Sequence, residues 1–471
     1  RLGWLDVAAR SAGLVPQLVA LRAELLAEDL DRVVLCGMGG SSLAPEVICR
    51  GAGVDLVVLD STHPDQVRAA LADLPRTVVV VSSKSGKTLE TDSQRRSFVA
   101  AFEAAGIDPR RRIVVVTDPG SDLEQLARDE GYREVFLADP HVGGRYSALT
   151  AFGLVPSALA GADVELLLRQ AEPVLANLGN DDCPGLALGA ALGGVGRDKV
   201  ALDGSGSDLP GFGDWAEQLI AESTGKEGRG LLPVVVEAGP EVRWPADDVH
   251  VVRLADPAPE LGTLVTGELG EQFITWIYGV AVAGRLLGIN PFDQPDVESA
   301  KTAARALLDQ TPAAEPVAFV EGSVEVRGTA GLLEGVTTLA GAVDALLSLL
   351  PKDGYLALMA YLDRHRDSAL ACVREPLCRR TQRPVTFGWG PRFLHSTGQF
   401  HKGGTPVGVF LQVTGLVEED LAIPDRPFTY GDLIASQAAG DAQVLAQHGR
   451  PVLRLHLTSS DGLKQVLEAL Q

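Results

Sequence analysis

The feature of this chain that most constrains its fold is the apolar, β-branched run Thr-Val-Val-Val-Val at residues 77–81. Such a run is typical of a strand that is buried on both faces of a parallel sheet. The segment that follows, Ser-Lys-Ser-Gly-Lys-Thr-Leu-Glu-Thr at residues 83–91, predicts a turn and the start of a helix. Free backbone N–H groups and the helix dipole favour an anion there, so we expect a phosphate-binding loop. An ordinary helix cap, with Glu90 in a capping box, is the alternative.

The same strand–helix pattern recurs along the chain. One amphipathic helix is expected within residues 1–30, and further strands are expected from residue 31 and at 54–60 and 112–117. Strands that alternate with helices predict a parallel sheet with helices on both faces. A second α/β unit is predicted by strands at 199–202, 231–236 and 250–254, followed by two helices within residues 267–310. A third is predicted by strands at 316–320, 354–359, 384–387, 408–413 and 452–456. We therefore expect three units, at residues 1–178, 179–311 and 312–471.

Composition restricts the classes of function. The 471 residues carry a formal net charge of -21, and 46% of them are hydrophobic. This acidity opposes binding to nucleic acid or to anionic lipid, and no apolar stretch is long enough to cross a membrane. Five cysteines without metal-type spacing predict reduced thiols in the cytoplasm. The chain begins with Arg1 and has no signal-peptide pattern, so we expect a processed or excised chain that is not exported. The expected ligand is small and anionic, held by local cations.

A glycine turn follows the first predicted strand, with the sequence Gly-Met-Gly-Gly-Ser-Ser at residues 37–42. It partly matches a dinucleotide-binding fingerprint, and Asp60 lies at the expected offset, but Ser42 replaces the third glycine. A sugar-phosphate turn is therefore favoured over nucleotide binding or a purely structural turn. Both polar turns follow strands of one sheet, so we expect them to meet at its carboxyl edge, where open α/β sheets bind ligands.

Further along the chain, several side chains are suited to catalysis. Arg145 follows two glycines, Glu222 ends a predicted helix, and Lys301 lies on another helix. His395 and His401 lie in a loop rich in Gly, Ser and Thr. A positioned carboxylate can act as a general base, and a fixed cation can stabilise an oxyanion. Each residue also has an ordinary interpretation, as a solvated charge or as part of a polar surface loop.

Taken in order, five segments resemble the glucose-6-phosphate isomerase family of the sugar-isomerase superfamily. They are the two polar turns, Gly-Gly-Arg-Tyr-Ser at 143–147, Ala-Glu-Ser-Thr-Gly-Lys at 221–226, and Asn-Pro-Phe-Asp-Gln-Pro-Asp-Val-Glu-Ser-Ala-Lys at 290–301. The resemblance implies an α/β fold with two sugar-isomerase-type parallel-sheet α/β sandwich domains plus a C-terminal α/β region. The whole chain is similar to the isomerase part of bacterial proteins in which transaldolase and this isomerase are fused.

The resemblance implies an aldose–ketose isomerase that interconverts glucose 6-phosphate and fructose 6-phosphate through a cis-enediol, without a metal or redox cofactor. It implies that Glu222 moves a proton between C2 and C1, that Arg145 steadies the enediolate, and that Lys301 assists ring opening near Gln294. The implied contacts to phosphate and sugar are Gly39, Gly40, Ser41, Ser83, Lys84, Ser85 and Thr88. The family commonly forms homodimers with shared sites. A dual glucose/mannose phosphate isomerase and a noncatalytic phosphosugar-binding regulator stay open as alternatives.

The chain departs from the family pattern at two places. Lys87 stands where many members have Thr, so phosphate affinity or its response to salt is expected to differ. The histidine that opens the sugar ring in the family, often lent by a neighbouring subunit, has no match in Gly-Glu-Leu-Gly-Glu-Gln-Phe at residues 267–273. Our hypothesis is that His395 or His401 takes over this role.

Overall fold

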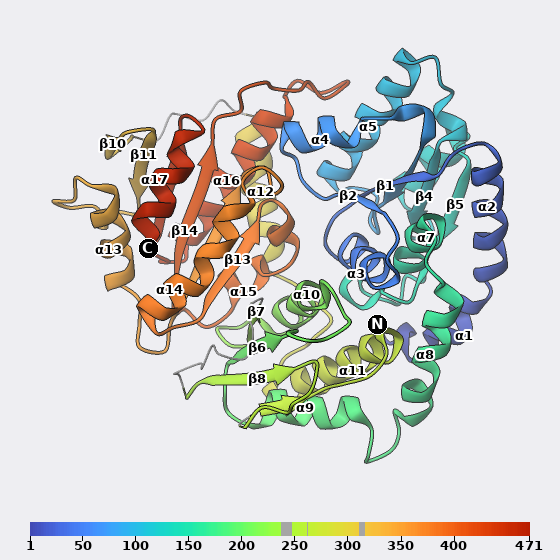
Figure 1. Cartoon of the computed structure of the whole chain (residues 1–471), viewed down its shortest axis with the longest axis horizontal. Helices are drawn as coiled ribbons and strands as arrows, with labels where there is room; N and C mark the ends of the chain where they lie inside the picture. Colours follow the sequence, from blue (N-terminus) through green and yellow to red (C-terminus); the bar gives the residue numbers. More distant parts are fainter. Residues whose placement is uncertain (237–246, 261, 310–315) are drawn as a thin grey trace.

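The computed structural model describes residues 1–236, 247–260, 262–309 and 316–471. Within them the chain forms three sheets, each built from a separate part of the sequence. Figure 1 shows the first sheet in blue to teal, the second in green to yellow-green and the third in gold to red. Helix α10 (Phe212–Thr224) lies near the middle of this view, between the three sheets.

The first sheet has five parallel strands in the order β2-β1-β3-β4-β5. The strands are β1 (Arg32–Gly37), β2 (Val57–Leu59), β3 (Thr77–Ser82), β4 (Ile113–Thr117) and β5 (Glu134–Leu137). Alternate residues of β3 enter two different cores, Val78 and Val80 on one face and Val79 and Val81 on the other. The strand order changes direction between β1 and β3, so the loops after these two strands are neighbours at the carboxyl edge.

Helices cover both faces of this sheet. Those on one face are α2 (Val15–Ala27), α3 (Leu43–Ala52) and α7 (Ala151–Ala160); those on the other are α4 (Pro64–Ala70), α5 (Leu89–Ala104) and α6 (Asp122–Asp129). The helix predicted within residues 1–30 is present as α2, whose Leu18, Leu21 and Leu25 are buried, but the 3-10 turn η1 (Gly3–Asp6) and α1 (Val7–Ala12) before it were not predicted. Gly13 ends α1, and Pro16 lies in the first turn of α2, where its missing N–H is tolerated.

The second sheet has four parallel strands in the order β7-β6-β8-β9. They are β6 (Lys199–Asp203), β7 (Leu232–Val236), β8 (Val249–Arg253) and β9 (Gly262–Leu264), and the associated helices are α8 (Val164–Asn177), α9 (Pro184–Gly194), α10 and α11 (Leu269–Leu287). Phe212 and Trp215 of α10 pack against Phe273 and Trp276 of α11, with ring centroids 4.6 to 6.0 Å apart. This aromatic cluster fixes the orientation of α10, whose last turn carries Glu222.

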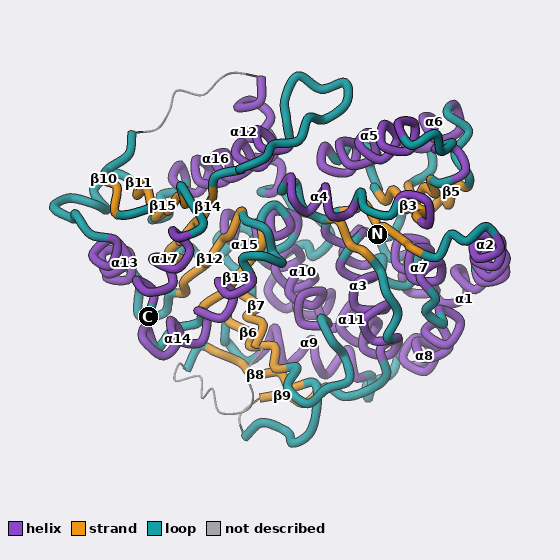
Figure 2. Tube along the Cα trace, turned by 45° about the horizontal axis from the view of Figure 1, so that its top comes forward, coloured by secondary structure: helices purple, strands orange, loops and turns teal. Residues whose placement is uncertain are grey.

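The third sheet is mixed, with six strands in the order β10-β11-β15-β14-β12-β13. They are β10 (Phe319–Glu321), β11 (Val324–Gly328), β12 (Tyr355–Tyr361), β13 (Val385–Trp389), β14 (Gly408–Gly415) and β15 (Val452–Leu457). In Figure 2, α12 (Val297–Asp309) and α16 (Tyr430–Gln447) lie on one side of it, and α13 (Leu339–Ser348), α14 (Arg374–Thr381) and α17 (Asp461–Leu470) lie on the other. The short elements η7 (Arg392–His395) and α15 (Gly398–Gly403) follow β13.

The predicted α/β fold class is confirmed, and every predicted strand is present. Strands β5, β9 and β11 were not predicted from the sequence. Each of the three expected units contains one sheet, but their boundaries stay a prediction, and the one at 311/312 lies outside the described residues. In the described part of the chain, none of the helices has the length and apolar character needed to cross a membrane.

Candidate active site

The predicted phosphate loop connects β3 to α5. Ser83 Oγ lies 3.0 Å from Thr88 Oγ1, and Ser85 Oγ accepts a hydrogen bond from the backbone N–H of Lys87 at 3.2 Å. Gly86 has a φ of +69°, and a Cβ there would lie 2.7 Å from the backbone nitrogen of Leu123. The loop is therefore folded tightly on itself and against the start of α6. The Thr88 hydroxyl is bonded to Ser83. It therefore does not cap the backbone at the start of α5.

The predicted contacts Gly39 and Gly40 lie where three loops converge. Both belong to η2 (Gly39–Ser41), which also contains the buried Ser41. A Cβ on Gly40 would lie 2.1 Å from the carbonyl oxygen of Gly144, in η5 (Gly144–Tyr146). A Cβ on Gly39 would lie 2.8 Å from the carbonyl oxygen of His395 and 2.8 Å from Gln218 Nε2. Only glycine permits these close approaches between η2, η5 and η7.

A cavity of about 270 Å³ lies beside the phosphate loop. Four predicted site residues line it, namely Ser85, Thr88, Lys301 and His395. The other lining residues are Lys87, Leu89, Glu90, Ala304, Arg305, Leu308, Leu394, Leu433 and Gln437. They come from the first unit, from α12 and from the C-terminal part of the chain. The cavity thus combines hydroxyls and cations, as binding of a small phosphorylated molecule requires.

His395 contacts Glu90 in the wall of this cavity. His395 Nε2 lies 3.0 Å from Glu90 Oε1, and the same oxygen accepts a hydrogen bond from Gln437 Nε2 at 2.8 Å. Burial alone would raise the pKa of Glu90, but the charge and hydrogen bond of His395, together with the charge of Lys301, lower it to about 2. Glu90 is therefore an ionised, buried carboxylate that fixes the orientation of the His395 imidazole.

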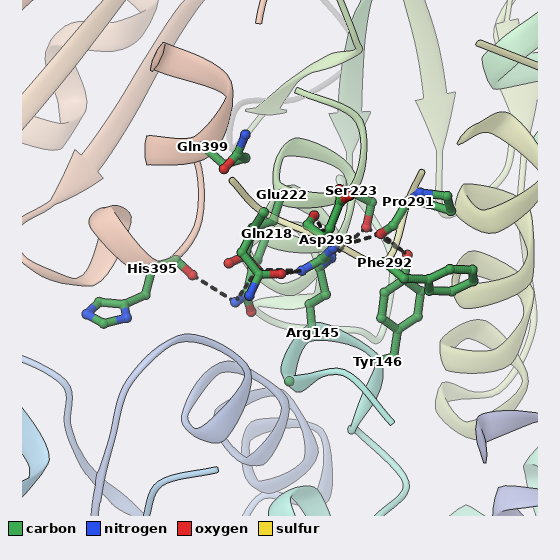
Figure 3. A network of polar contacts seen from close by, with 12 residues as sticks. Arg145, Tyr146, Gln218, Glu222, Ser223, Pro291, Phe292, Asp293, His395 and Gln399 are labelled. Carbon is green, nitrogen blue, oxygen red and sulfur yellow. Dashed lines mark hydrogen bonds and ion pairs between the residues drawn. The ribbon is translucent and has the colours of Figure 1, made fainter. Parts of the chain in front are cut away.

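Arg145 is held rigidly in η5 by neighbours on α10 and in the loop between α11 and α12 (Figure 3). Its Nε donates to Ser223 Oγ at 2.8 Å, and its Nη1 donates to Gln294 Oε1 at 2.8 Å. Its Nη2 donates to the carbonyl oxygens of Pro291 and Asp293 at 2.7 and 3.0 Å. The side chain is only 3% exposed. A guanidinium fixed in this way has little freedom left to lose when charge develops beside it.

Glu222 lies beside this guanidinium at the end of α10. Its Oε2 is 3.6 Å from Arg145 Nη1, a charge contact that is too long for a hydrogen bond. Gln218, one turn earlier, donates from Nε2 to the same oxygen at 3.1 Å and to the carbonyl oxygen of His395 at 2.8 Å. Figure 3 shows that His395 turns this carbonyl toward Gln218 while its imidazole points away. Gln218 thus joins the Glu222–Arg145 pair to the wall of the cavity.

Lys84 and His401 are two of the predicted residues that lie outside the cavity lining. Lys84 Nζ is 2.6 Å from Asp118 Oδ2. His401 is buried beside the rings of Tyr355, Phe393 and Phe410, and burial lowers its pKa to about 3. The structure therefore brings His395, and not His401, to the cavity.

Several residues of the site escaped the sequence analysis. Glu90 was considered only as a helix cap, and Gln218 and Gln437 were not considered. Arg305 lies four residues after Lys301, so both share one face of α12. This spacing could have identified Arg305 as a site residue from the sequence. No local pattern points to Glu90 or Gln437, because their partners lie 305 and 347 positions away in the sequence.

Among the described residues, one group has the geometry of a metal site, His63, Asp65 and Asp363. Asp65 already forms ion pairs with Arg68 at 2.7 Å and with Arg366 at 3.0 Å. None of the three acidic or imidazole groups lines the cavity. The chemistry available at the cavity itself is proton transfer by carboxylate and imidazole groups beside fixed cations.

Comparison with known proteins supports the resemblance drawn from the motifs. A family model described as phosphoglucose isomerase matches residues 25–174. A probable glucose-6-phosphate isomerase of Haloarcula marismortui is 38% identical over 215 residues, which are 44% of this chain and 49% of that protein. The glucose-6-phosphate isomerase of Clostridium tetani is 25% identical over 389 residues, covering 65% of this chain and 86% of that protein.

A solved structure extends the similarity to the fold. The crystal structure of a glucose-6-phosphate isomerase from Chlamydia trachomatis superposes with a TM-score of 0.53 at 21% identity, covering 64% of this chain and 73% of that chain. The match to the Haloarcula marismortui protein spans only about half of that relative's length. Residues 25–174 are thus similar to the phosphoglucose isomerase family, and the solved structure shows a similar fold over about two thirds of the chain.

Proposed function

We propose that the chain is an aldose–ketose isomerase that interconverts glucose 6-phosphate and fructose 6-phosphate through a cis-enediol. The observation that best supports this is one continuous arrangement. Ser85, Lys301 and His395 surround a cavity, and Gln218 connects that cavity to the Glu222–Arg145 pair. The names of the related proteins point to the same reaction. We also propose that the protein is cytoplasmic and homodimeric.

In the proposed mechanism, the phosphate binds at the start of α5. The hydroxyls of Ser85 and Thr88 lie there beside the cationic side chain of Lys87. Free N–H groups of the first helical turn add to the attraction for an anion. The sugar extends from this end of the cavity past Gln218 toward Glu222.

His395 opens the sugar ring. The neutral imidazole acts here: with Nε2–H donated to Glu90, its Nδ1 takes the proton of the anomeric hydroxyl. Lys301, on the same cavity wall, supplies a proton to the ring oxygen as the bond between that oxygen and the anomeric carbon breaks. The products of this step are a free hydroxyl and an open-chain carbonyl.

Glu222 then carries out the isomerisation. Its carboxylate removes the proton from C2 of the open-chain aldose, and the electron pair of that bond forms the enediolate. Arg145 stabilises the negative oxygen, since its guanidinium is already fixed beside Glu222. A proton then passes from the C2 hydroxyl to the C1 oxygen, so that the C2 carbonyl forms, and protonated Glu222 returns its proton to C1 to complete the ketose. Transition-state stabilisation of this kind contributes about 100- to 1,000-fold in rate.

A coupled assay for glucose 6-phosphate formation from fructose 6-phosphate tests the proposal with Glu222→Gln beside the parent. We expect kcat to fall at least about 1,000-fold, because an amide cannot accept the C2 proton. Affinity for fructose 6-phosphate, measured calorimetrically, should change little.

Glu217→Gln is the matched control, since it makes the same change on the same helix. Burial, followed by the charge of Asp214, raises the pKa of Glu217 to about 8, so its side chain is neutral near pH 7 and a neutral amide resembles it. This control should retain parental turnover. A parent protein that binds the sugar phosphate without turning it over would support the regulator alternative and contradict the enzyme.

A further inference from the structure

Arg392 opens the short helix η7, which ends at His395. Its Nη1 lies 2.6 Å from Glu46 Oε2 and 2.7 Å from Asp60 Oδ2, and its Nη2 lies 3.7 Å from Asp214 Oδ2. The guanidinium is 13% exposed. One cation of the C-terminal unit is thus bound by carboxylates of the first and second units.

These carboxylates are rigidly placed. Glu46 lies on α3, and Asp60 directly follows β2; their side chains are 8% and 1% exposed. Burial alone would raise the pKa of Glu46, but Arg392, followed by Arg364 and Arg50, holds it well below its usual range. Glu46 is therefore ionised and buried, and Asp60 is a buried carboxylate in ion-pair contact with Arg364 and Arg392. Such groups bind a cation firmly because leaving them unpaired is costly.

The other end of η7 is fastened to the same helix that carries Glu222. Gln218 of α10 donates to the carbonyl oxygen of His395, and Asp214 lies one turn earlier on α10, beside Arg392. Residues four apart share one face of a helix. Both ends of η7 therefore lie along a single face of α10, and the lack of a side chain at Gly39 allows η2 to close over this junction.

We propose that Arg392 is a positioning residue that fixes η7 and thereby holds the His395 imidazole in the cavity wall against Glu90. The catalytic consequence rests on the proposed function. Arg392 itself does not line the cavity. Without the Arg392 hydrogen bond to Asp60 and the ion pairs with Glu46 and Asp214, the start of η7 is no longer fastened to the first two units, and the imidazole at its other end loses its fixed distance from the substrate.

The test uses Arg392→Met in the Glu222→Gln background, where proton transfer at carbon is blocked and ring opening can be observed alone. Carbon-13 exchange NMR measures catalysed interconversion of the two ring anomers of fructose 6-phosphate. We expect this rate to fall about 10- to 100-fold, since small displacements of a catalytic group have effects of that size. Binding of fructose 6-phosphate should stay within about threefold, because Arg392 does not touch the cavity.

Two variants control for loss of the ion-pair network itself. Arg50→Met removes a second ion pair of Glu46, in which Arg50 Nη2 lies 2.7 Å from Glu46 Oε1. Arg50 does not contact η7, so the rate of ring opening should be unchanged. Arg392→Lys keeps the charge but not the planar fork, so it should restore ring opening only in part. If Arg392→Met does not fold, the rate of ring opening in Arg392→Lys tests the proposal instead, and it should lie below that of the Glu222→Gln protein.

A second readout is independent of any activity. The rate at which diethyl pyrocarbonate modifies His395, mapped by mass spectrometry, should rise severalfold in Arg392→Met and stay parental in Arg50→Met. If the parent shows no isomerase activity but this rate still rises, the proposed function fails and the positioning role stands. Rates of modification and of ring opening both within twofold of the parent would overturn the proposal for Arg392.

Discussion

At the scale of single residues, the structure contains two buried glutamates in opposite states. Glu90 is ionised, because His395 and Lys301 outweigh the effect of its burial. At Glu217, burial and then the charge of Asp214 outweigh the charges of Arg374 and Arg392 and raise the pKa to about 8. The residue type is the same in both cases, and the surrounding charges decide whether the carboxyl is a charged anchor or a neutral part of the interior.

The state of Glu217 predicts a pH-dependent stability. Above its unfolded-state pKa of 4.5, the folded protein keeps a proton that the unfolded chain has lost, so this residue stabilises less and less as the pH rises toward 8. Glu217→Gln removes that loss. The quantity to measure, by differential scanning calorimetry, is the Tm of this variant minus the Tm of the parent. We expect this difference to be about 2–4 °C larger at pH 8.5 than at pH 5.5.

Glu103→Gln provides the comparison for this prediction. It makes the same change at an exposed position of α5. Its Tm difference from the parent should be the same at both pH values. A constant difference for Glu217→Gln as well would show that Glu217 is ionised in the folded protein throughout this range.

At the scale of elements, the site depends on how closely η2, η5 and η7 approach one another. We expect Gly40→Ala to lower the Tm by several degrees and to reduce isomerase turnover, because its methyl group would overlap the carbonyl group of Gly144. Gly13→Ala is the matched control, since Gly13 has a helical φ of -63° and open space around it. Equal Tm values for the two variants would contradict this close approach.

The sequence predicted some elements and site residues better than others. Long β-branched runs such as 77–81 identify their strands unambiguously, whereas β9 (Gly262–Leu264) has three residues and no apolar periodicity. Arg145, Glu222 and Lys301 were found through family-type motifs, which are local in sequence. Glu90 and Gln437 were not found as site residues, because only the packing of α5 against the C-terminal unit brings them to His395.

At the scale of the whole molecule, the residues that line the cavity come from distant parts of the same chain. This arrangement predicts that Glu222→Gln and His395→Asn do not complement each other when co-expressed with different tags, even in a mixed dimer. A site shared between subunits would instead restore roughly a quarter of the parental activity, since random pairing gives one intact site in half of the dimers. Co-expression of the parent with either variant is the positive control for assembly. Recovery in the doubly mutant mixture would show that His395 acts in the partner subunit.

The cavity is lined by the first unit, α12 and the C-terminal part of the chain, and these are synthesised at different times. Glu90 and its partner His395 are 305 positions apart, so at ordinary rates of protein synthesis the phosphate loop leaves the ribosome roughly 15 to 60 s before the histidine that faces it. During that interval the first sheet is able to fold, but the wall formed by η7 and α16 does not yet exist. A nascent or prematurely terminated chain is therefore expected to hold a phosphosugar weakly at most and to leave its ring closed.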